Sequence, residues 1–259
     1  MASKKPNQLI KSLDRALDIL ELIVGKENGM GVTEISRELD IHKSTVYRLL
    51  DTLKFRGYLE KNEDNHKYIA GINLFELSSK VLNDIDSRVR VRPYLEELMQ
   101  KTKETIHLGI LDSGEVIYLD KVESTATIRM YSQVGKRVPA HSTSLGKAIM
   151  AHLSEDRVKE ILKEKGMEKN TENTITELDK FLDHLKKVRK QGFAVDDEEQ
   201  EKDIRCIAGP IFNHRGDVVA AFSISAPITR MTEERMKELA QLVVEYSQKM
   251  SRSLGYSSL

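Results

Sequence analysis

The sequence predicts two domains: a helical N-terminal domain that ends in a β-hairpin, and a larger α+β domain with an antiparallel sheet. Three observations predict this division. The chain has 259 residues, more than the ~100–150 of a typical single domain. Two short helical patterns surround a tight turn between Val32 and Tyr58. Alternating apolar residues, which are typical of strands, recur after Thr105.

The composition is that of a protein with packed hydrophobic cores and a charged surface that faces water. Hydrophobic residues make up 39% of the chain and charged residues 32%, which argues against a membrane protein. The N-terminus lacks the apolar segment of a signal peptide, and the longest apolar run, near Val218–Ser225, is too short to span a bilayer. Cys206 is the only cysteine, so no disulfide can form within the chain. We therefore expect a cytoplasmic protein without membrane contact.

The first helix is expected to begin after Ser12, a residue type that is favourable as an N-cap. Its predicted buried stripe comprises Leu13, Ala16, Leu17, Leu20 and Ile23. Residues 26–31 then interrupt the helical pattern, and Thr33 is expected to cap the second helix.

The helix that follows the turn at Ile41–His42 has two contrasting faces. One face is an apolar stripe at helical spacing, formed by Val46, Leu49, Leu50 and Leu53. The other face carries side chains that can hydrogen-bond and are not needed in a core, namely Ser44, Thr45, Tyr47 and Arg48. A helix-turn-helix places such a face in the major groove of DNA, although an ordinary surface helix would show the same pattern.

The residues that follow this helix favour the first interpretation. Gly57 ends the helix, where a residue that tolerates positive φ is preferred. Residues 58–61 and 67–70 flank a polar turn and predict a β-hairpin, and a hairpin after the recognition helix makes a winged helix-turn-helix. We expect DNA contacts from both helices and from the hairpin, through Thr33, Lys43, Ser44, Thr45, Tyr47, Arg48, Lys61 and Lys67.

The charge distribution fits duplex DNA better than the net charge suggests. The chain has a net charge of zero, but between Ile41 and Lys61 five basic residues accompany two acidic ones, a surplus of three. A local surplus matters because phosphate attraction is screened within about 8 Å at physiological salt. With no tryptophan and 5% aromatic residues, a stacking platform for single strands is not expected. Double-stranded operator DNA is the predicted partner.

A connecting helix is expected after Gly71, with a narrow apolar stripe formed by Leu74, Leu77, Val81 and Ile85. Such a stripe suits packing on its own domain or on a second copy of the chain, so we expect a homo-oligomer, either a dimer or a tetramer. Pro93 is expected to start the next helix, Pro93–Lys103, because proline is favoured at the first position. The predicted division is 1–71 for the DNA-binding domain, 72–92 for the connecting helix and linker, and 93–259 for the second domain.

The second domain is expected to combine strands and helices around an antiparallel sheet. A hairpin is predicted at Thr105–Leu111 and Val116–Val122, followed by a third strand at Ala126–Tyr131. The remaining predicted strands are Phe193–Val195, Ile204–Phe212 and Val218–Ala226. Helices are predicted, mainly at the ends of the sheet and on one face, at Ser142–Leu153, Ser154–Lys165, Thr176–Gln191 and Thr232–Leu254.

The last predicted strand could line a binding site. Alternation places Phe222 and Ile224 on one face, where they would fill a core, and Ser223 and Ser225 on the other, among small neighbours. A strand with one solvated face would show the same pattern. Residues 141–145 open a helix whose first N–H groups favour anions, although the hydroxyl side chains there could simply cap that helix.

Longer motifs resemble a known family. Residues 12–20 (SLDRALDIL), 33–36 (TEIS) and 44–53 (STVYRLLDTL) resemble the DNA-binding domain of the IclR family of bacterial transcription regulators. Residues 139–148 (PAHSTSLGKA), 188–199 (VRKQGFAVDDEE) and 206–212 (CIAGPIF) resemble its effector-binding domain. The resemblance spans about residues 12–254. It implies a GAF-like fold for the second domain, where many members bind small organic acids.

The resemblance also implies an effector site, carried over residue by residue. A small carboxylate, such as a sugar acid, would contact the backbone N–H groups of Ser144 and Leu145. It would also contact four side chains, those of Asp196, Cys206, Ser223 and Ser225. The motifs of serine acyl transfer, of P-loops and of zinc sites are absent from the sequence. We therefore expect no catalytic residue, no metal and no cofactor.

These patterns together predict a ligand-responsive DNA-binding transcription regulator, specifically a repressor of a catabolic operon. Two alternatives are a metabolite-processing enzyme with a vestigial DNA-binding domain and a structural nucleoid-binding protein. Sequence-specific DNA binding without turnover of the metabolite would exclude the enzyme, and preference for one promoter would exclude the nucleoid protein.

Overall fold

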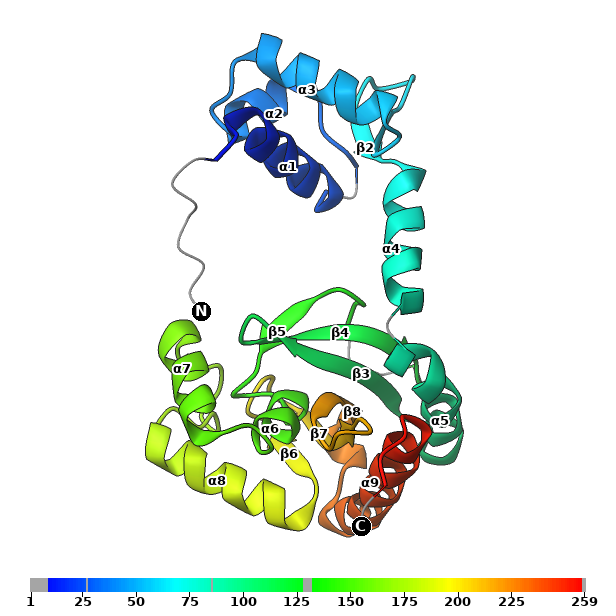
Figure 1. Ribbon diagram of the computed structural model, residues 1–259, viewed down its shortest axis with the longest axis vertical. Helices are drawn as coiled ribbons and strands as arrows, with labels where there is room; N and C mark the ends of the chain where they lie inside the picture. The colour runs from blue at the N-terminus through cyan, green and yellow to red at the C-terminus, as the bar shows by residue number, and fades with distance from the viewer. Residues whose placement is uncertain (1–8, 27, 85, 128–131, 258–259) are drawn as a thin grey trace. The chain divides into compact units, whose positions relative to one another are not determined.

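The computed structural model describes residues 9–26, 28–84, 86–127 and 132–257. The chain forms two compact units, Met1–Asp84 and Ile85–Leu259 (Figure 1). The N-terminal unit has one hydrophobic core and the C-terminal unit has two. Over these residues, no helix is long and apolar enough to cross a membrane.

The N-terminal unit is a winged helix-turn-helix, as the sequence predicts. Its elements are α1 (Lys11–Val24), α2 (Val32–Glu38), α3 (Lys43–Phe55), β1 (Leu59–Lys61), β2 (Tyr68–Ala70) and α4 (Ile72–Asp84). The two strands pair in an antiparallel hairpin, the wing. Helices and wing share one core, whose fully buried members include Ile19, Ile35, Val46, Leu50, Leu59 and Tyr68.

The apolar stripe of α3 and the turn after it are confirmed. All four stripe residues are buried or half-buried against the core: Val46, Leu49, Leu50 and Leu53. Just past the helix, Gly57 has a φ of 69°, and the Tyr58 N–H donates to the Leu53 carbonyl at 2.9 Å. A left-handed residue at this position lets the chain reverse out of the helix and enter the wing.

The first turns of α1 and α2 differ from the prediction. α1 begins at Lys11 without a side-chain cap, so Ser12 is not its N-cap. α2 begins at Val32, and the Glu34 carboxylate accepts a hydrogen bond from the Gly31 N–H at 2.7 Å. A carboxylate in the first turn satisfies a free N–H donor there, so the helix does not need Thr33 as a cap.

The buried face of α1 was also predicted wrongly in part. Ile19 and Ile23 are buried, whereas Leu13 and Leu17 are 57% and 48% exposed. The core is formed by the face of α1 that carries Ile19 and Ile23. The predicted stripe included Ile23 but omitted Ile19. The two leucines, one turn apart, form an uncovered apolar strip.

The predicted stripe of the connecting helix is described only at its start. In α4, Leu74 is half-buried and Leu77 is exposed. The side chains of Val81 and Ile85 lie outside the described residues. Ile72 and Phe75, which were not part of the predicted stripe, are 60% and 67% exposed.

Pro93 lies inside α5 (Asp86–Thr102) instead of at its start. The helix continues through the proline because Val91, Leu95 and Leu98 form one fully buried stripe on both sides of it. Burial of three large side chains, at roughly 1.5–3 kcal/mol each, offsets the backbone hydrogen bond that a proline cannot donate.

The C-terminal unit is built on a six-stranded antiparallel sheet with the strand order β5-β4-β3-β8-β7-β6. Its strands are β3 (Thr105–Asp112), β4 (Glu115–Val122), β5 (Arg137–Pro139), β6 (Ala194–Asp197), β7 (Ile204–Phe212) and β8 (Val218–Pro227). The central pair, β3 and β8, joins strands from opposite ends of the unit's sequence. This α+β architecture confirms the predicted fold class.

Helices cover both faces of the sheet, whereas the sequence suggested mainly its ends and one face. The unit contains α6 (Ser144–Met150), α7 (Glu155–Lys165), α8 (Leu178–Gln191), the short η1 (Ile228–Arg230) and α9 (Glu233–Ser253). α5 and α9 share one core with Phe222 and Ile224, and α6, α7 and α8 share the other with Ala221. Alternation along β8 thus serves two cores at once.

Several local predictions in this unit are confirmed and others corrected. Ser154 caps α7 and Gly192 ends α8, as expected. α6 is shorter than the predicted Ser142–Leu153, because the Thr143 hydroxyl caps it by accepting from the Gly146 N–H at 3.3 Å. Of the third strand predicted at 126–131, residues 128–131 lie outside the described part, and residues 126–127 form a bend.

Candidate functional site

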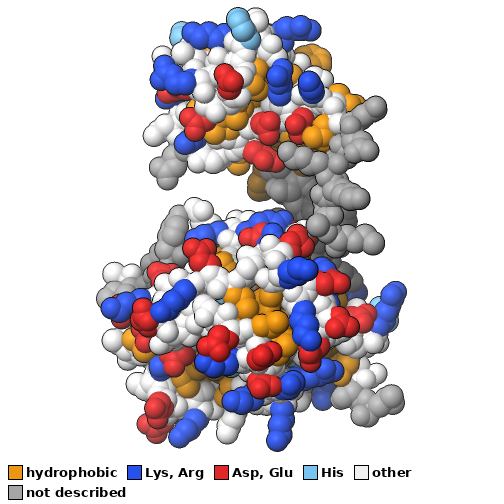
Figure 2. Space-filling model, turned by 90° about the vertical axis from the view of Figure 1, so that its left-hand side faces the viewer, with side chains coloured by type: hydrophobic (Ala, Val, Ile, Leu, Met, Phe, Trp, Pro, Cys, Tyr) orange, Lys and Arg blue, Asp and Glu red, His pale blue; other side chains and the backbone are white. Residues whose placement is uncertain are grey.

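The outer face of α3 carries the polar side chains that were predicted to read DNA. Lys43, Ser44, Tyr47 and Arg48 are exposed, and Thr45 is half-buried. Lys, Arg and His side chains gather along the edge of the N-terminal unit that holds this helix (Figure 2). A helix with one buried apolar face and one face of hydrogen-bond donors meets the requirement for reading base edges in a major groove.

The predicted wing residues have partners within the unit. Lys61 Nζ lies 5.9 Å from the centre of the Tyr68 ring, and Lys67 Nζ lies 3.5 Å from Glu34 Oε1. An ion pair this exposed stabilises a fold by only ~0–1 kcal/mol, so phosphate could replace Glu34 beside Lys67. Thr33, next to Glu34 on α2, is exposed.

The predicted effector residues of the strands lie side by side in the sheet. Strand pairing sets Asp196 opposite Cys206, and Cys206 opposite Ser225. Ser223 shares the face of Ser225, and the two serines are only 2% and 3% exposed. Their burial excludes the alternative of a strand with one solvated face. Four of the six predicted residues are thus neighbours.

His107, which the sequence analysis did not single out, completes this polar layer. It pairs with Ser223 across β3 and β8. Its Nδ1 lies 3.3 Å from Ser225 Oγ and its Nε2 lies 2.7 Å from Ser132 Oγ. Burial, followed by the nearby Lys121, lowers the pKa of His107 to about 3. The ring is therefore neutral at pH 7, with one donor and one acceptor nitrogen.

A close backbone contact fixes the start of α6 against the segment that precedes it. A Cβ atom at Gly146 would lie 2.1 Å from the Ala140 carbonyl oxygen, so only glycine fits there. Leu145 lies over β3, where its Cδ1 would be 3.1 Å from a Cβ atom at Gly109. The N–H groups of Ser144 and Leu145, in the first turn of α6, have no hydrogen-bond partner in the part of the chain that the structure describes.

A buried ion pair between Lys147 and Glu199 lies beside the layer. The Lys147 side chain is fully buried and that of Glu199 is 8% exposed. The N–H groups of Glu199 and Gln200 donate to Asp196 Oδ1 at 2.8 and 3.2 Å. Glu199 Oε2 is buried and has no hydrogen-bond partner among the described atoms. It is an acceptor that a ligand could use.

Burial controls the protonation of the layer. It raises the pKa of Asp196 to about 7, although Lys147 and the two N–H donors act in the opposite direction. It also raises the pKa of Glu199 and of the Cys206 thiol. Cys206 is therefore a protonated, weakly polar side chain, not a nucleophile. Within the described ranges, no group of three His, Cys, Asp or Glu side chains could hold a metal ion.

The sequence analysis missed three members of the site: His107, Lys147 and Glu199. His107 alternates with the apolar Ile106 and Leu108, a signal that it faces away from the core that those two side chains fill. Lys147 and Glu199 are separated by 52 residues, and nothing local in the sequence indicates that they meet.

Comparison with known proteins places both units in one family. Residues 79–252 match the family described as bacterial transcriptional regulator IclR C-terminal, and residues 12–63 match the IclR helix-turn-helix domain. The HTH-type transcriptional regulator KdgR of Escherichia coli (strain K12) is 40% identical over 98% of this chain and 95% of its own. The transcriptional repressor IclR of the same organism is 32% identical over 95% of this chain and 90% of its own. The crystal structure of the Thermotoga maritima IclR has a TM-score of 0.83 at 36% identity, and the match covers 96% of this chain and 100% of that one.

A winged helix-turn-helix and a separate domain with an enclosed polar layer define a ligand-responsive DNA-binding transcription regulator. The chain belongs to the IclR family of bacterial transcriptional regulators. Proteins of this family bind DNA and small-molecule effectors. Its relatives are regulators and not enzymes, which confirms the predicted regulator over the enzyme alternative.

Asp196→Asn is expected to alter the pH dependence of stability. Because its folded-state pKa of about 7 lies above the ordinary value, the folded protein keeps this proton between about pH 4 and pH 7, while the unfolded chain loses it. The wild type should lose stability as pH rises through that interval. The variant should lose less, by about 1 kcal/mol or more. Urea unfolding at both ends of the interval measures the difference, with exposed Asp217→Asn as the control. Equal pH dependence in wild type and Asp196→Asn would contradict the assigned protonation.

Proposed function

We propose that the chain is a homodimeric repressor of a catabolic operon, which leaves its operator when a small carboxylate such as a sugar acid binds in the C-terminal unit. The observation that supports effector binding in the C-terminal unit is the buried layer of Ser223, Ser225 and His107. An apolar sheet face would pack without these groups, so their burial points to a ligand. We place the protein in the cytoplasm, where operator DNA is accessible.

The proposed sequence-specific DNA binding rests on Arg48. It is exposed on the outer face of α3, one turn after Ser44 and Thr45 near the start of the helix. A guanidinium group can donate two parallel hydrogen bonds to a guanine edge, whereas a phosphate contact would carry no sequence information. We assign Arg48 to base reading, and Lys61 and Lys67 to phosphate contacts from the wing.

Arg48→Ala should leave the fold intact because the side chain lies outside the core. If Arg48 reads a base, the change should weaken operator binding by about 1–3 kcal/mol and relax the preference at one base position. Binding to a set of operator variants, measured at fixed salt, tests this, with exposed Arg15→Ala on α1 as the control. Unchanged operator affinity in Arg48→Ala would remove α3 from the groove, and a loss that is uniform across sequences would assign Arg48 to phosphate.

The proposed dimer rests on apolar side chains that the N-terminal unit leaves exposed. On α1, Leu13 and Leu17 are about half exposed, and on α4, Ile72 and Phe75 are more exposed still. Several large apolar side chains exposed on two helices of one small unit are typical of an interaction surface. Because one winged helix reads only a short site, a second copy is the partner that specificity requires, and a two-fold pair would read an inverted repeat.

Ile72→Glu with Phe75→Glu should therefore weaken the dimer and operator binding together. We expect the dissociation constant of the dimer to rise about tenfold or more, because two charges would be buried without partners. Sedimentation equilibrium and operator titrations of the same samples give both quantities. Asn28→Glu, which adds charge to an exposed loop of the same unit, is the control. A monomeric double variant with full operator affinity would overturn the proposed pairing.

The ligand chemistry follows from the groups that are available. The free N–H groups of Ser144 and Leu145 suit a carboxylate. The hydroxyls of Ser223 and Ser225 can exchange hydrogen bonds with ligand hydroxyl groups, and the unpartnered Glu199 Oε2 can accept one more. One anion-binding element beside several groups that bind hydroxyls favours a hydroxylated acid over a plain fatty or aromatic one.

Ser223→Ala combined with Ser225→Ala should weaken effector binding about several-fold or more, since each lost hydrogen bond costs ~0.5–1.5 kcal/mol. Operator affinity without effector should remain nearly unchanged, because the two serines and α3 belong to different units. Calorimetry with a panel of small carboxylates, including sugar acids, measures the first effect. Ser253→Ala, outside the proposed site, is the control. An active carboxylate that binds wild type and double variant equally would place the effector elsewhere.

A further inference from the structure

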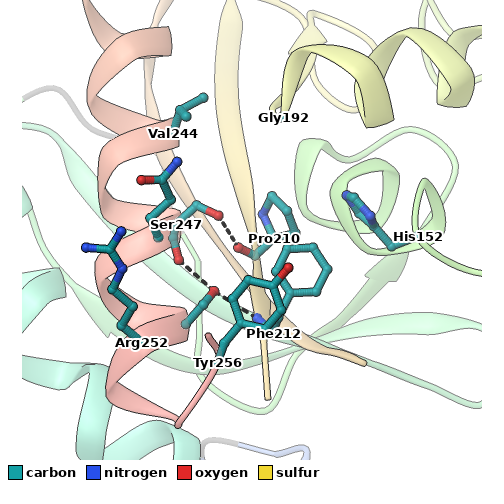
Figure 3. Close-up of a pocket in the computed structure, with 10 residues that line it drawn as sticks. His152, Gly192, Pro210, Phe212, Val244, Ser247, Arg252 and Tyr256 are labelled. Carbon is teal, nitrogen blue, oxygen red and sulfur yellow. Dashed lines mark hydrogen bonds between the residues drawn. The ribbon is translucent and has the colours of Figure 1, made fainter. Parts of the chain in front are cut away.

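A cavity lies in the C-terminal unit beside residues 209–212 of β7, which β6 leaves unpaired on one side (Figure 3). Its volume is about 320 Å³, and it is bounded by the end of β7, the C-terminal half of α9, Gly192 and His152. The residues of the polar layer, such as Ser223 and Asp196, do not line it. Its volume falls within the ~300–1,000 Å³ range of small-molecule sites.

The strand pairing explains why the cavity exists. β6 pairs with β7 only as far as Ala194 opposite Ala208, so residues 209–212 of β7 have one free edge. Pro210 suits that edge, because it has no N–H to leave unpaired. The register of β7 against β8 shifts between Ile211 and Phe212, and such an irregularity can redirect a side chain.

Aromatic rings form much of the cavity wall. The Phe212 and Tyr256 rings lie 5.3 Å apart between centroids with 30° between their planes. The His152 ring meets Phe212 edge-on, with centroids 4.8 Å apart and 88° between planes. Pro210 and Val244 add further apolar surface. A wall of this kind accepts the flat face of a ring or a compact apolar group.

The two serine hydroxyls of the wall already have partners. The Ser247 hydroxyl donates to the Pro210 carbonyl, and the Ser251 hydroxyl accepts from the Phe212 N–H at 3.0 Å and donates to the Ser247 carbonyl at 2.6 Å. These bonds, shown as dashed lines in Figure 3, fix α9 against β7 and engage both serine hydroxyls. The surface that the wall presents is still mainly apolar.

Four side chains at the cavity carry polar atoms without a hydrogen-bond partner in the described part of the chain, namely those of His152, Gln248, Arg252 and Tyr256. His152 Nε2 is buried and has no hydrogen-bond partner within the described chain. Burial, followed by the nearby Arg189, lowers the pKa of His152 to about 4, so the ring is neutral at pH 7. The Arg252 side chain is exposed, lines the cavity and makes no ion pair with any described residue. A single unpaired cation beside an apolar wall suits one negative charge.

We propose that this cavity is a second ligand site, for a compact cyclic or aromatic monocarboxylate. The carboxylate meets the Arg252 guanidinium, and the ring lies against Phe212, Pro210 and Tyr256. A polar atom on the ring reaches His152 Nε2. The site shares β7 with the proposed effector site, which uses Cys206 nearer the other end of that strand.

A ligand-detected NMR titration of the full chain with benzoate and with cyclohexanecarboxylate tests the proposal. Both carboxylates should bind saturably. Benzamide keeps the ring and removes the charge, so its affinity should be lower by a factor of about ten or more. Arg252→Gln should weaken benzoate binding about fivefold or more without changing Tm, because this side chain is exposed. Lys237→Gln removes a charge from an exposed position of the same helix and should leave benzoate binding unchanged.

His152→Phe keeps the ring contact with Phe212 and tests the buried nitrogen. A ring hydroxyl that donates to that nitrogen should make 3-hydroxybenzoate or 4-hydroxybenzoate bind more tightly than benzoate in the wild type but not in this variant. Ser223→Ala with Ser225→Ala should bind benzoate as the wild type does. The proposal is overturned by the absence of saturable benzoate binding, by equal binding to wild type and Arg252→Gln, by equal binding of benzamide, or by loss of binding in the double serine variant.

Discussion

The geometry of the proposed effector site depends on the buried ion pair between Lys147 and Glu199. Removing both charges from water costs several kcal/mol per ion unless they meet, so α6 and the segment after β6 must come together in the folded protein. From the same segment, the N–H groups of Glu199 and Gln200 donate to Asp196, and the Thr174 hydroxyl donates to the Glu199 carbonyl. One interaction therefore holds the first turn of α6, with its free N–H groups, in a fixed position relative to the polar strands.

The two units differ in the kinds of side chain that they bury. In the N-terminal unit an apolar core leaves a polar recognition face free, and nothing in that core requires a ligand. In the C-terminal unit hydroxyl groups, a neutral imidazole and a carboxyl group are buried together and hydrogen-bond to protein groups, while the buried Glu199 Oε2 has no partner among the described residues, which is unfavourable. A ligand that hydrogen-bonds to Glu199 Oε2 and exchanges hydrogen bonds with the other groups can favour one conformation of the protein over another. It acts on DNA affinity only through its different affinities for those conformations.

Much of the fold could be predicted because its signals are local. The stripe of α3, the turn at Gly57 and the strand Ile204–Phe212 follow from periodicity and turn chemistry over a few residues. Predictions failed where the answer depends on distant packing. Pro93 stays inside α5 because of the apolar stripe on both sides of it, and Leu13 is exposed because the core uses the isoleucine face of α1. Similarly, Ser223 and Ser225 were visible in the alternation of one strand, whereas His107 joins them through pairing of β3 with β8, between segments 118 residues apart.

A crystal structure of the full chain with a bound hydroxylated carboxylate tests the central claim most directly. The ligand can be selected from a panel of small acids by its ability to release the operator. We expect its carboxylate at the N–H groups of Ser144 and Leu145, and its hydroxyl groups within hydrogen-bonding distance of Ser223 and Ser225. An active ligand bound elsewhere, with both serines still bonded only to protein atoms, would contradict the assignment of the buried polar layer as the effector site.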